Sequence, residues 1–321
     1  MRKIIFALAL ILAGCSAWAS ERDIEVVTDT FRLPGTLTLP DGVVEKVPCV
    51  VFVHGSGPND RNETIGPNNV FKDLADSLSA KGIASLRYDK RTLVYRANFV
   101  PKGKDANYDF EAIDDAVSAV ALAQSMPEID ASKVYVVGHS LGAMLAPEIA
   151  SRAKDVAGIV MLAAPSEKLP DMMIYQTNFL KGIYEEMGAS QAVKMAEEIS
   201  VKCKNAKLLG TPEYDPEIGL PDGLTESYLK ADSEYDAIAV AKALDMRMFI
   251  VFGMRDYQVP YSNYAKWQKA LAGKPEATVK LYFGLNHILR IGSGKPSPME
   301  YAEAKPISAE VVADIVDFVR K

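Results

Sequence analysis

The sequence predicts an α/β fold in which a mostly parallel β-sheet is flanked by helices and carries a helical cap insertion. Short apolar runs rich in β-branched residues, typical of buried parallel strands, alternate along the chain with amphipathic helical stretches. One such run, residues 134–137, passes through a tight glycine-containing turn directly into a helical stretch. From residue 164 to about residue 240 the alternation stops and no clear strand pattern appears, which predicts the helical cap.

The bulk composition fits one large α/β domain. The chain has 321 residues, of which 49% are hydrophobic, enough for a sizeable buried core. Its formal net charge is −6 and its isoelectric point is about 5.3. No block of basic residues occurs. Nucleic acid is therefore not an expected partner.

The first residues, 1–19, have the pattern of an export signal. Arg2 and Lys3 precede an uninterrupted apolar run over residues 4–13. That run is too short to span a bilayer as a transmembrane helix. We therefore expect an exported protein, located in the bacterial periplasm or cell envelope.

The cleavage site of this export signal has two interpretations. Residues 12–15 resemble the lipobox of bacterial lipoproteins, in which a small residue precedes a lipidated cysteine, here Cys15. Residues 17–19 form an ordinary A-x-A site ending at Ala19. The lipobox is the preferred interpretation, and its lipid at Cys15 would be the chain's only contact with a membrane.

Residues 20–163 are predicted to form the first part of the core. The alternation of apolar and polar residues over 24–39 predicts an antiparallel hairpin at the edge of the sheet. Buried strands are then expected over 49–53, 83–88, 134–137 and 157–163, and helices over 70–81 and 110–126. The charged triplet 89–91 is interpreted as a loop held by local ion pairs.

The cap is predicted over residues 164–240, with helices over 172–183 and 191–201. Its methionines have two interpretations, because a flexible thioether suits both an acyl pocket and packing of the cap on the core. These are Met172, Met173, Met187 and Met195.

Residues 241–321 are predicted to complete the core. Strands are expected over 248–252 and 278–283, and helices over 260–271 and 308–320, the last with Ser308 as its N-cap. Cys49 and Cys203 are the cysteines beyond the leader, and two buried thiols are the simpler interpretation, although export would permit a disulfide.

The turn at residues 138–142 reads G-H-S-L-G and lies between a predicted strand and a predicted helix. In that context G-x-S-x-G is the signature of a serine nucleophile on a sharp turn. The glycines permit a backbone too tight for a Cβ, and Ser140 is held out at the end of the strand. The following helix directs free N–H groups and a partial positive charge at the same point.

A serine nucleophile needs a base, and only three histidines are available. His54 lies in the loop after an early strand, and His139 is adjacent to Ser140 on the chain, where its side chain cannot easily face the same hydroxyl. His287 follows the last predicted strand, at the edge of the sheet where Ser140 also lies. Asp256 is the one aspartate between Ser140 and His287 that follows a buried strand. The order serine, acid, histidine is therefore satisfied.

With these residues in place, the sequence after the leader resembles the α/β-hydrolase family throughout its length. It is most similar to the single-domain carboxylesterase branch near the dienelactone hydrolases and the prolyl-oligopeptidase-type hydrolases. The matching segments are 54–58, 138–142, 253–256 and 286–287. One departure is Ala143, where the peptidases usually carry a second glycine, and the chain has no room for their propeller domain.

The resemblance implies acyl transfer to water by a Ser140–His287–Asp256 triad, with neither a cofactor nor a metal. It also implies that the N–H groups of Leu141 and Ser56 hold the oxyanion, with Gly57 as the alternative to Ser56. The expected substrate is a small-molecule or carbohydrate-linked carboxylic ester.

Three functions compete at this point. A carboxylesterase is preferred because a complete set of triad candidates is present. A peptidase or an acyltransferase could use the same triad, and a non-catalytic binding module is the alternative from another class. The sequence leaves the acyl length, the alcohol, the role of the cap and the oligomeric state open.

Overall fold

A computed structural model describes residues 20–321, and its centre is an eight-stranded sheet in the order β1-β2-β6-β3-β7-β8-β9-β10. The predicted export signal, with both Cys15 and Ala19, lies outside the described residues. The strands of this sheet are β1 (Ser20–Thr28), β2 (Phe31–Leu39), β3 (Val47–Val53), β6 (Ala84–Tyr88), β7 (Ile129–His139), β8 (Gly158–Leu162), β9 (Met248–Gly253) and β10 (Ala277–Tyr282).

The sheet is antiparallel at one edge and parallel elsewhere. The hairpin of β1 and β2 pairs antiparallel, and β2 pairs antiparallel with β6. All later pairings, from β3–β6 to β9–β10, are parallel. The central strands β6, β8 and β9 are buried along their whole length, as continuous apolar runs predict. The mostly parallel sheet predicted from the sequence is therefore confirmed.

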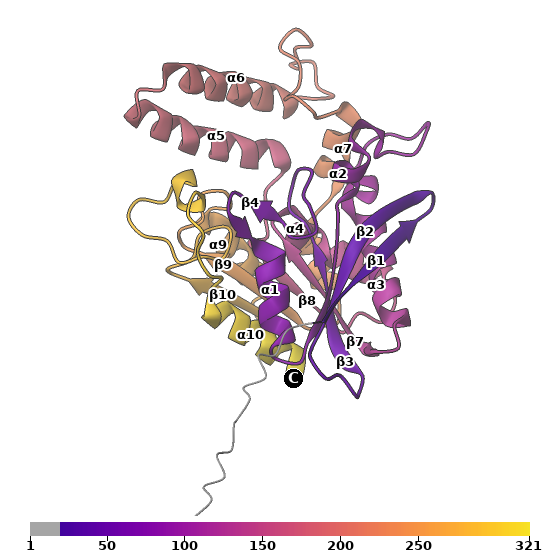
Figure 1. Cartoon of the computed structure of the whole chain (residues 1–321). Coiled ribbons are helices and arrows are strands. Elements are labelled where there is room, and N and C mark those ends of the chain that lie inside the picture. Colours follow the sequence, from indigo (N-terminus) through magenta and orange to yellow (C-terminus); the bar gives the residue numbers. More distant parts are fainter. Residues whose placement is uncertain (1–19) are drawn as a thin grey trace, which may run out of the picture.

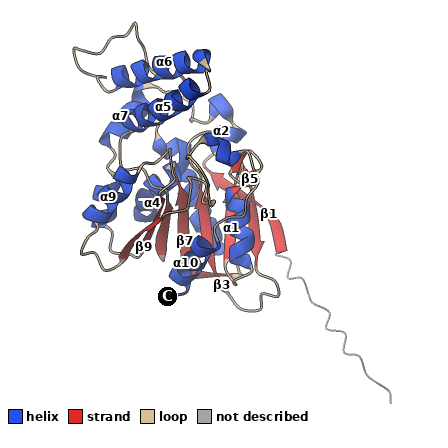
Figure 2. Cartoon of the chain, turned by 90° about the vertical axis from the view of Figure 1, so that its left-hand side faces the viewer, coloured by secondary structure: helices blue, strands red, loops and turns tan. Residues whose placement is uncertain are grey.

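Helices cover both faces of this sheet (Figures 1 and 2). One hydrophobic core forms on the face with α3, α4, α8 and α9, and the other on the face with α1 and α10. The helices of these two layers are α1 (Val70–Ser79), α3 (Asp114–Ser125), α4 (Leu141–Arg152), α8 (Ala237–Ala243), α9 (Tyr261–Ala270) and α10 (Ala309–Arg320). Shorter elements lie in the connections: β4 (Thr64–Ile65), β5 (Asn68–Asn69), α2 (Arg91–Val94), η1 (Arg96–Asn98), η2 (Asp109–Ile113) and η3 (Pro298–Tyr301).

Three helices between β8 and α8 rise above the sheet, over the ends of its strands (Figure 1). They are α5 (Leu169–Glu186), α6 (Ser190–Ala206) and α7 (Glu226–Glu234), and we call them the cap helices. α5 and α6 extend beyond the predicted bounds 172–183 and 191–201 at both ends. They run side by side as a hairpin, and α7 lies beside the end of that hairpin at which α5 begins and α6 ends.

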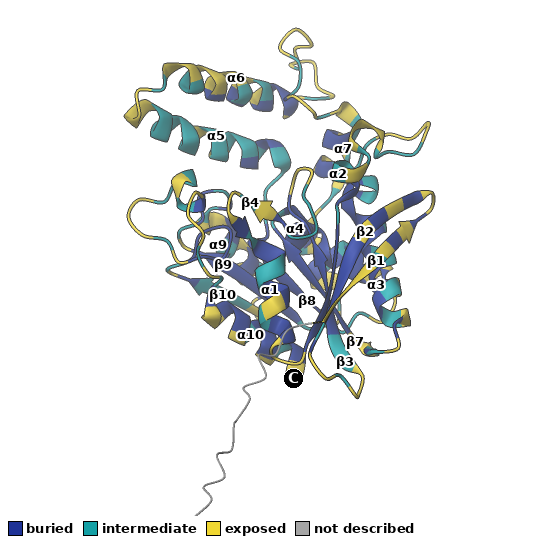
Figure 3. Cartoon of the chain, in the orientation of Figure 1, coloured by how far each residue is buried: buried dark blue, intermediate teal, exposed yellow. Residues whose placement is uncertain are grey.

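Burial separates the core from the cap helices (Figure 3). The central strands and the inner faces of α1, α4 and α10 are buried, whereas α5 has only Pro170 and Met172 buried. Cys49 and Cys203 are both buried and unpaired. Within residues 20–321, no helix has both the length and the apolarity needed to cross a membrane.

One detail of the predicted helix ends differs from the structure. Ser308 precedes α10 as expected, but its hydroxyl accepts no hydrogen bond from the first turn of that helix. The backbone N–H of Ser308 instead donates to the carbonyl of Leu289, 3.0 Å away. This residue therefore fixes the start of α10 through its main chain and not through a side-chain cap.

Candidate active site

Ser140 lies at the sharp turn between β7 and α4, with φ 52° and ψ −115°. A positive φ is strained for a residue with a Cβ, and such residues concentrate at functional sites. The flanking glycines explain how the turn closes. A Cβ on Gly138 would collide with the backbone of Gly142, and one on Gly142 would collide with the carbonyl of Val53. The Ser140 N–H donates to Leu162 in β8, so the turn is fixed on the sheet.

His287 and Asp256 form a buried pair beside this turn. The distance from His287 Nδ1 to Asp256 Oδ2 is 2.7 Å, and both side chains are almost fully buried. The other carboxylate oxygen of Asp256 accepts the backbone N–H groups of Gln258 at 2.7 Å and Val259 at 2.9 Å. With Nδ1 held by the carboxylate, Nε2 of His287 is the ring nitrogen left to exchange a proton.

Ser140 and His287 line the same cavity, whose volume is about 750 Å³. Its walls come from the loop after β3, from the start of α4, and from the cap. The cap side chains in its wall include Leu169, Met172, Met173, Gln176 and Tyr228. Cavities of this size are typical of sites for small organic ligands.

Two of the four cap methionines do not belong to this cavity. Met187 and Met195 are 65% and 53% exposed and contribute neither to the cavity wall nor to packing on the core. For these two residues both interpretations of the sequence are wrong. A helical apolar pattern does not distinguish the inner face of a cap from its solvent face when the cap is only two helices thick.

The backbone N–H groups of Ser56 and Leu141 have no hydrogen-bond acceptor among the described residues. Within residues 20–321, neither group donates to a backbone or side-chain oxygen. By contrast, the N–H of the neighbouring Gly55 is occupied, because it donates to Glu63 Oε1 at 2.7 Å. Ser56 and Leu141 also line the cavity beside Ser140, so their free donors are available to a ligand there.

The two remaining histidines, His54 and His139, are buried, and His139 has both ring nitrogens engaged with groups other than Ser140. His139 Nε2 donates to the backbone carbonyl of His287 at 2.9 Å, and His139 Nδ1 is 2.9 Å from Glu63 Oε2. Burial alone would lower the pKa of His139, but the adjacent Glu63 carboxylate outweighs it and raises that pKa. Burial likewise opposes ionisation of Glu63, yet its contact with His139 lowers the pKa of this carboxyl. Glu63 and His139 therefore form a buried ion pair under the site.

His54 has the opposite environment. Its ring lies against Phe71 and Tyr88, with centroids 5.3 Å away in both cases. Burial lowers the pKa of His54 to about 4, so this ring is neutral at physiological pH. His54 is thus a packing residue beneath the loop that carries Ser56.

Lys90 and Arg91 are buried, Asp89 is half-buried, and all three make long-range contacts, so the interpretation of this triplet as a loop with local ion pairs is wrong. Asp89 pairs with Arg61 at 2.9 Å, Lys90 with Glu111 at 2.5 Å, and Arg91 with Asp115 at 2.8 Å. Lys90 also donates to the carbonyl of Gly55, in the loop of the free N–H donors. Sequence reasoning missed this network because each partner lies more than twenty positions away.

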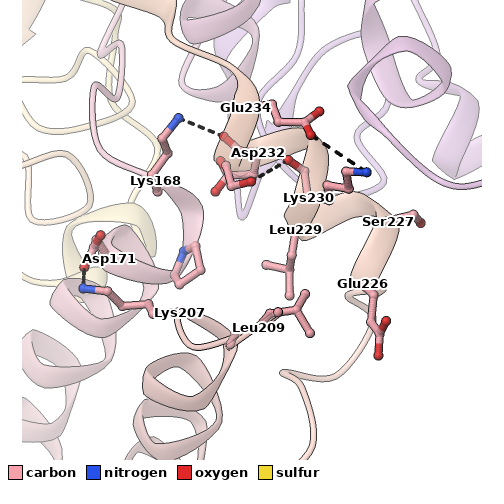
Figure 4. A pocket seen from close by; sticks show the side chains of 14 residues that line it. Lys168, Asp171, Lys207, Leu209, Glu226, Ser227, Leu229, Lys230, Asp232 and Glu234 are labelled. Atoms are coloured by element: carbon pink, nitrogen blue, oxygen red, sulfur yellow. Dashed lines mark hydrogen bonds and ion pairs between the residues drawn. The ribbon is translucent and has the colours of Figure 1, made fainter. Parts of the chain in front are cut away.

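A second cavity of about 690 Å³ lies within the cap, between the start of α5, the end of α6 and α7 (Figure 4). It contains none of the predicted triad residues. Each of its three lysines is paired: Lys207 with Asp171, Lys230 with Glu234, and Lys168 with the carbonyl of Asp232. Within residues 20–321, no group of three or more His, Cys, Asp or Glu side chains is arranged to hold a metal ion.

Comparison with known proteins identifies this architecture. Residues 50–311 match the model of the alpha/beta hydrolase family. The chain is 38% identical to esterase EstD of Thermotoga maritima over 301 residues, which are 94% of this chain and 68% of that protein.

Solved esterases share its fold at low sequence identity. Est1E from Butyrivibrio proteoclasticus superposes with a TM-score of 0.59 at 16% identity, over 93% of this chain and 99% of that one. The Pyrococcus furiosus esterase Pf2001 gives a TM-score of 0.59 at 14% identity, over 94% and 91% of the two chains. The chain therefore belongs to the α/β-hydrolase family and is an enzyme of its esterase type.

Proposed function

We propose that this enzyme hydrolyses carboxylic esters through a Ser140–His287–Asp256 triad and an acyl-enzyme intermediate. The observation that carries the proposal is the strained Ser140 at the strand-to-helix turn, which shares one cavity with a histidine already bonded to a buried carboxylate. A nucleophile, a base and a group that orients the base are the three parts of such a mechanism.

In the first half of the reaction, Ser140 Oγ attacks the acyl carbon and its proton passes to Nε2 of His287. The tetrahedral intermediate then collapses, the bond to the alcohol oxygen breaks, and the imidazolium returns the proton to the leaving alcohol. In the second half a water molecule repeats the attack on the acyl-enzyme, and the carboxylic acid leaves as Ser140 regains its proton. Asp256 holds the imidazole in the required tautomer and stabilises its charged form.

The negative charge on the substrate oxygen is stabilised in this proposal by the N–H groups of Ser56 and Leu141. Both donors are free of protein acceptors in the described chain, and both line the cavity beside the nucleophile. The Leu141 group also lies at the N-terminus of α4, where the helix dipole favours a negative charge. Gly57 is the alternative second donor, because it lines the same cavity and its N–H also has no acceptor among the described residues.

The substrate class we propose is a small-molecule or carbohydrate-linked ester with an apolar portion that contacts the cap. Met172 and Met173 lie in the cavity wall and adapt to apolar groups of varied shape. Thr92, Gln176 and Thr225 in the same wall offer polar contacts for an alcohol moiety.

Hydrolysis of a panel of p-nitrophenyl esters, from acetate upward, tests this function. The wild-type enzyme should cleave members of the panel, and Ser140→Ala should not. A fluorophosphonate probe should label wild type at Ser140, and digestion with mass spectrometry should locate the adduct there. Unlabelled Ser140 in a folded protein, or full turnover by Ser140→Ala, would disprove the triad.

The export prediction is a separate proposal, because it concerns residues outside the described structure. We propose that the chain is exported and that Cys15 carries a lipid anchor. In membrane fractionation, wild type should sediment with the envelope and Cys15→Ser should be released, since the substitution removes the thiol that would carry the lipid. A soluble wild-type protein beginning at Ser20 would instead support cleavage after Ala19.

A further inference from the structure

The peptide group that joins Gly55 and Ser56 has different partners at its two ends. Peptide groups are planar, and all those described here are trans, so the Gly55 carbonyl and the Ser56 N–H point in opposite directions. The N–H is free and lines the cavity. The carbonyl oxygen, on the protein side, accepts hydrogen bonds from Lys90 Nζ at 2.8 Å and from Asn59 Nδ2 at 3.0 Å. Whatever fixes this carbonyl therefore also fixes the direction of the Ser56 N–H.

Lys90 is a buried cation, and its position is determined by a single carboxylate. It follows β6, its side chain is 2% exposed, and Nζ is 2.5 Å from Glu111 Oε1. Glu111 belongs to the π-helical turn η2, which directly precedes α3. Such turns are rare and are frequent at functional sites.

The same carboxylate connects Lys90 to the cap. Glu111 Oε2 accepts a hydrogen bond from the hydroxyl of Tyr228, which lies on cap helix α7. Tyr228 and Glu111 also line the catalytic cavity. A continuous chain of contacts therefore runs from α7 through Glu111 and Lys90 to the Gly55–Ser56 peptide group.

Stability alone does not account for a buried lysine at this position. Transfer of an ammonium group into the protein is costly, and apolar side chains of similar volume often serve stability equally well or better. A charged donor is stronger than a neutral one, however, and it holds a carbonyl in one orientation. The effect of this arrangement is to fix and polarise the Gly55–Ser56 peptide group.

We propose that Lys90 is a positioning residue that orients the Ser56 N–H toward the oxyanion, and that Glu111 and Tyr228 make this orientation depend on the seating of α7. The proposal rests on the proposed function, because it requires Ser56 to be an oxyanion donor. Lys90 itself touches no reacting atom. It acts through the peptide group whose carbonyl it binds.

This role predicts a specific kinetic defect in Lys90→Met, which keeps the length of the side chain and removes the charge. Donors to the oxyanion act more strongly on the transition state than on the bound substrate, so kcat should fall while KM changes little. Complete loss of one such donor costs about 10²–10³-fold in kcat. A misdirected donor should cost less, so we expect a decrease of about 10- to 100-fold.

The readout that separates positioning from general damage is the preference for an oxygen ester over the matching thionoester. In a thionoester the charge develops on sulfur, which is a weak hydrogen-bond acceptor, so the N–H donors assist it less. Wild type should prefer the oxygen ester strongly, and Lys90→Met should lose about tenfold or more of that preference. Asn59→Ala, which removes the second donor to the Gly55 carbonyl at a half-buried site, should shift the preference in the same direction by less.

Lys274→Met is the matched control. Lys274 also donates to a backbone carbonyl, that of Leu244, but it lies between α9 and β10 and contacts neither α7 nor the Gly55 loop. Its substitution should lower the melting temperature and leave the ester-to-thionoester ratio at the wild-type value. Tyr228→Phe, which breaks only the link to α7, should lower the preference for the oxygen ester by less than Lys90→Met does.

The outcomes are distinguishable from a failure of the proposed function. If wild type shows no preference for the oxygen ester, or if Ser140→Ala is active, the oxyanion site or the triad is wrong. If wild type discriminates and Ser140→Ala is inactive, but Lys90→Met and Asn59→Ala both keep the wild-type ratio, the positioning role of Lys90 is overturned. Should Lys90→Met fail to fold, Asn59→Ala and Tyr228→Phe decide the question by the same ratio.

Discussion

The two sides of the catalytic cavity are built in different ways. On the core side, Ser140, Asp256 and His287 follow the strands β7, β9 and β10, and each is fixed by hydrogen bonds to neighbouring strands or loops. On the cap side, α5 and α6 pack mainly against each other, and most of their side chains are half-exposed or exposed.

The ion pairs of the two sides also differ in how far they are buried. The core pairs beneath the site, such as Glu63 with His139, are almost fully buried. The cap pairs, such as Lys181 with Glu197, are largely solvent-exposed, and such pairs contribute little to stability because water and salt screen them. The comparison indicates that the chemistry is held by the rigid core, whereas the cap can vary in shape and composition at little cost in stability.

Removing the nucleophile should give the largest effect of any substitution and should leave the cap untouched. Ser140→Ala should lower kcat for ester hydrolysis by about 10⁴-fold or more, because triad members act as a unit. Its melting temperature should stay near that of wild type, since the change removes one oxygen atom from a half-buried residue. Steady-state kinetics and differential scanning calorimetry on the same preparations would measure both quantities.

The acid should be nearly as important. Asp256→Asn should lower kcat by about 10⁴-fold, because the amide would stabilise the wrong tautomer of His287. Asp245→Asn is the matched control, since Asp245 is exposed at the opposite end of β9. If the control lost activity and Asp256→Asn kept it, another acid would have to serve His287.

The buried neutral histidine of the core should make the fold sensitive to acid. The pKa of His54 is lowered to about 4, while an unfolded histidine titrates near 6.5, so the unfolded chain binds a proton first. Stability should therefore be lost as the pH falls from about 6.5 to about 4, by up to about 3 kcal/mol. His54→Phe should abolish that part of the pH dependence in urea unfolding, and an unchanged slope would contradict it.

The contribution of His139 to stability should depend on pH in the opposite direction to that of His54. Its pKa is raised in the folded state, because Glu63 outweighs the effect of burial. The stability that it contributes is fully present below about pH 6.5 and is lost as the pH rises through the raised value. His139→Gln should remove this loss at neutral to alkaline pH, measured by the same unfolding titration.

Substitutions in the cap should have the smallest effects and should alter substrate preference. Met173→Ala should change KM for long-chain esters by about tenfold or less, since a lost apolar contact is worth about 1–3 kcal/mol at most. The exposed Met187→Ala should leave KM unchanged for every ester in the panel. Equal effects of the two variants would show that Met173 does not contact the substrate.

The sheet, the helices and the positions of the triad candidates could be predicted because each depends on a local pattern. Buried parallel strands are continuous apolar runs, the glycines at 138 and 142 mark a tight turn, and residues that follow parallel strands meet at one edge. The alternation of strands with helices then places Asp256 one strand before His287 in the chain.

The network beneath the site could not be predicted, because its pairs are defined only by the tertiary fold. Lys90 and Glu111 are twenty-one positions apart, and Tyr228 is more than a hundred positions further along. Nor did any sequence pattern mark Glu63, which has a positive φ of 49° and is buried. Charged residues in loops are usually solvent-exposed, and this general rule predicts exposure for residues 89–91. Their contacts with distant partners could be known only from the tertiary fold.

The hydrogen bond from His139 to the carbonyl of His287 has a consequence for how this enzyme can diversify. It ties the residue before the nucleophile directly to the loop of the base, although 148 positions separate the two in the chain. All of the cap lies within that interval, so the reacting groups keep their mutual register without help from it. The α5–α6 hairpin can therefore be replaced by segments of other lengths and sequences without moving Ser140 or His287, whereas α7 is tied to Glu111 through Tyr228.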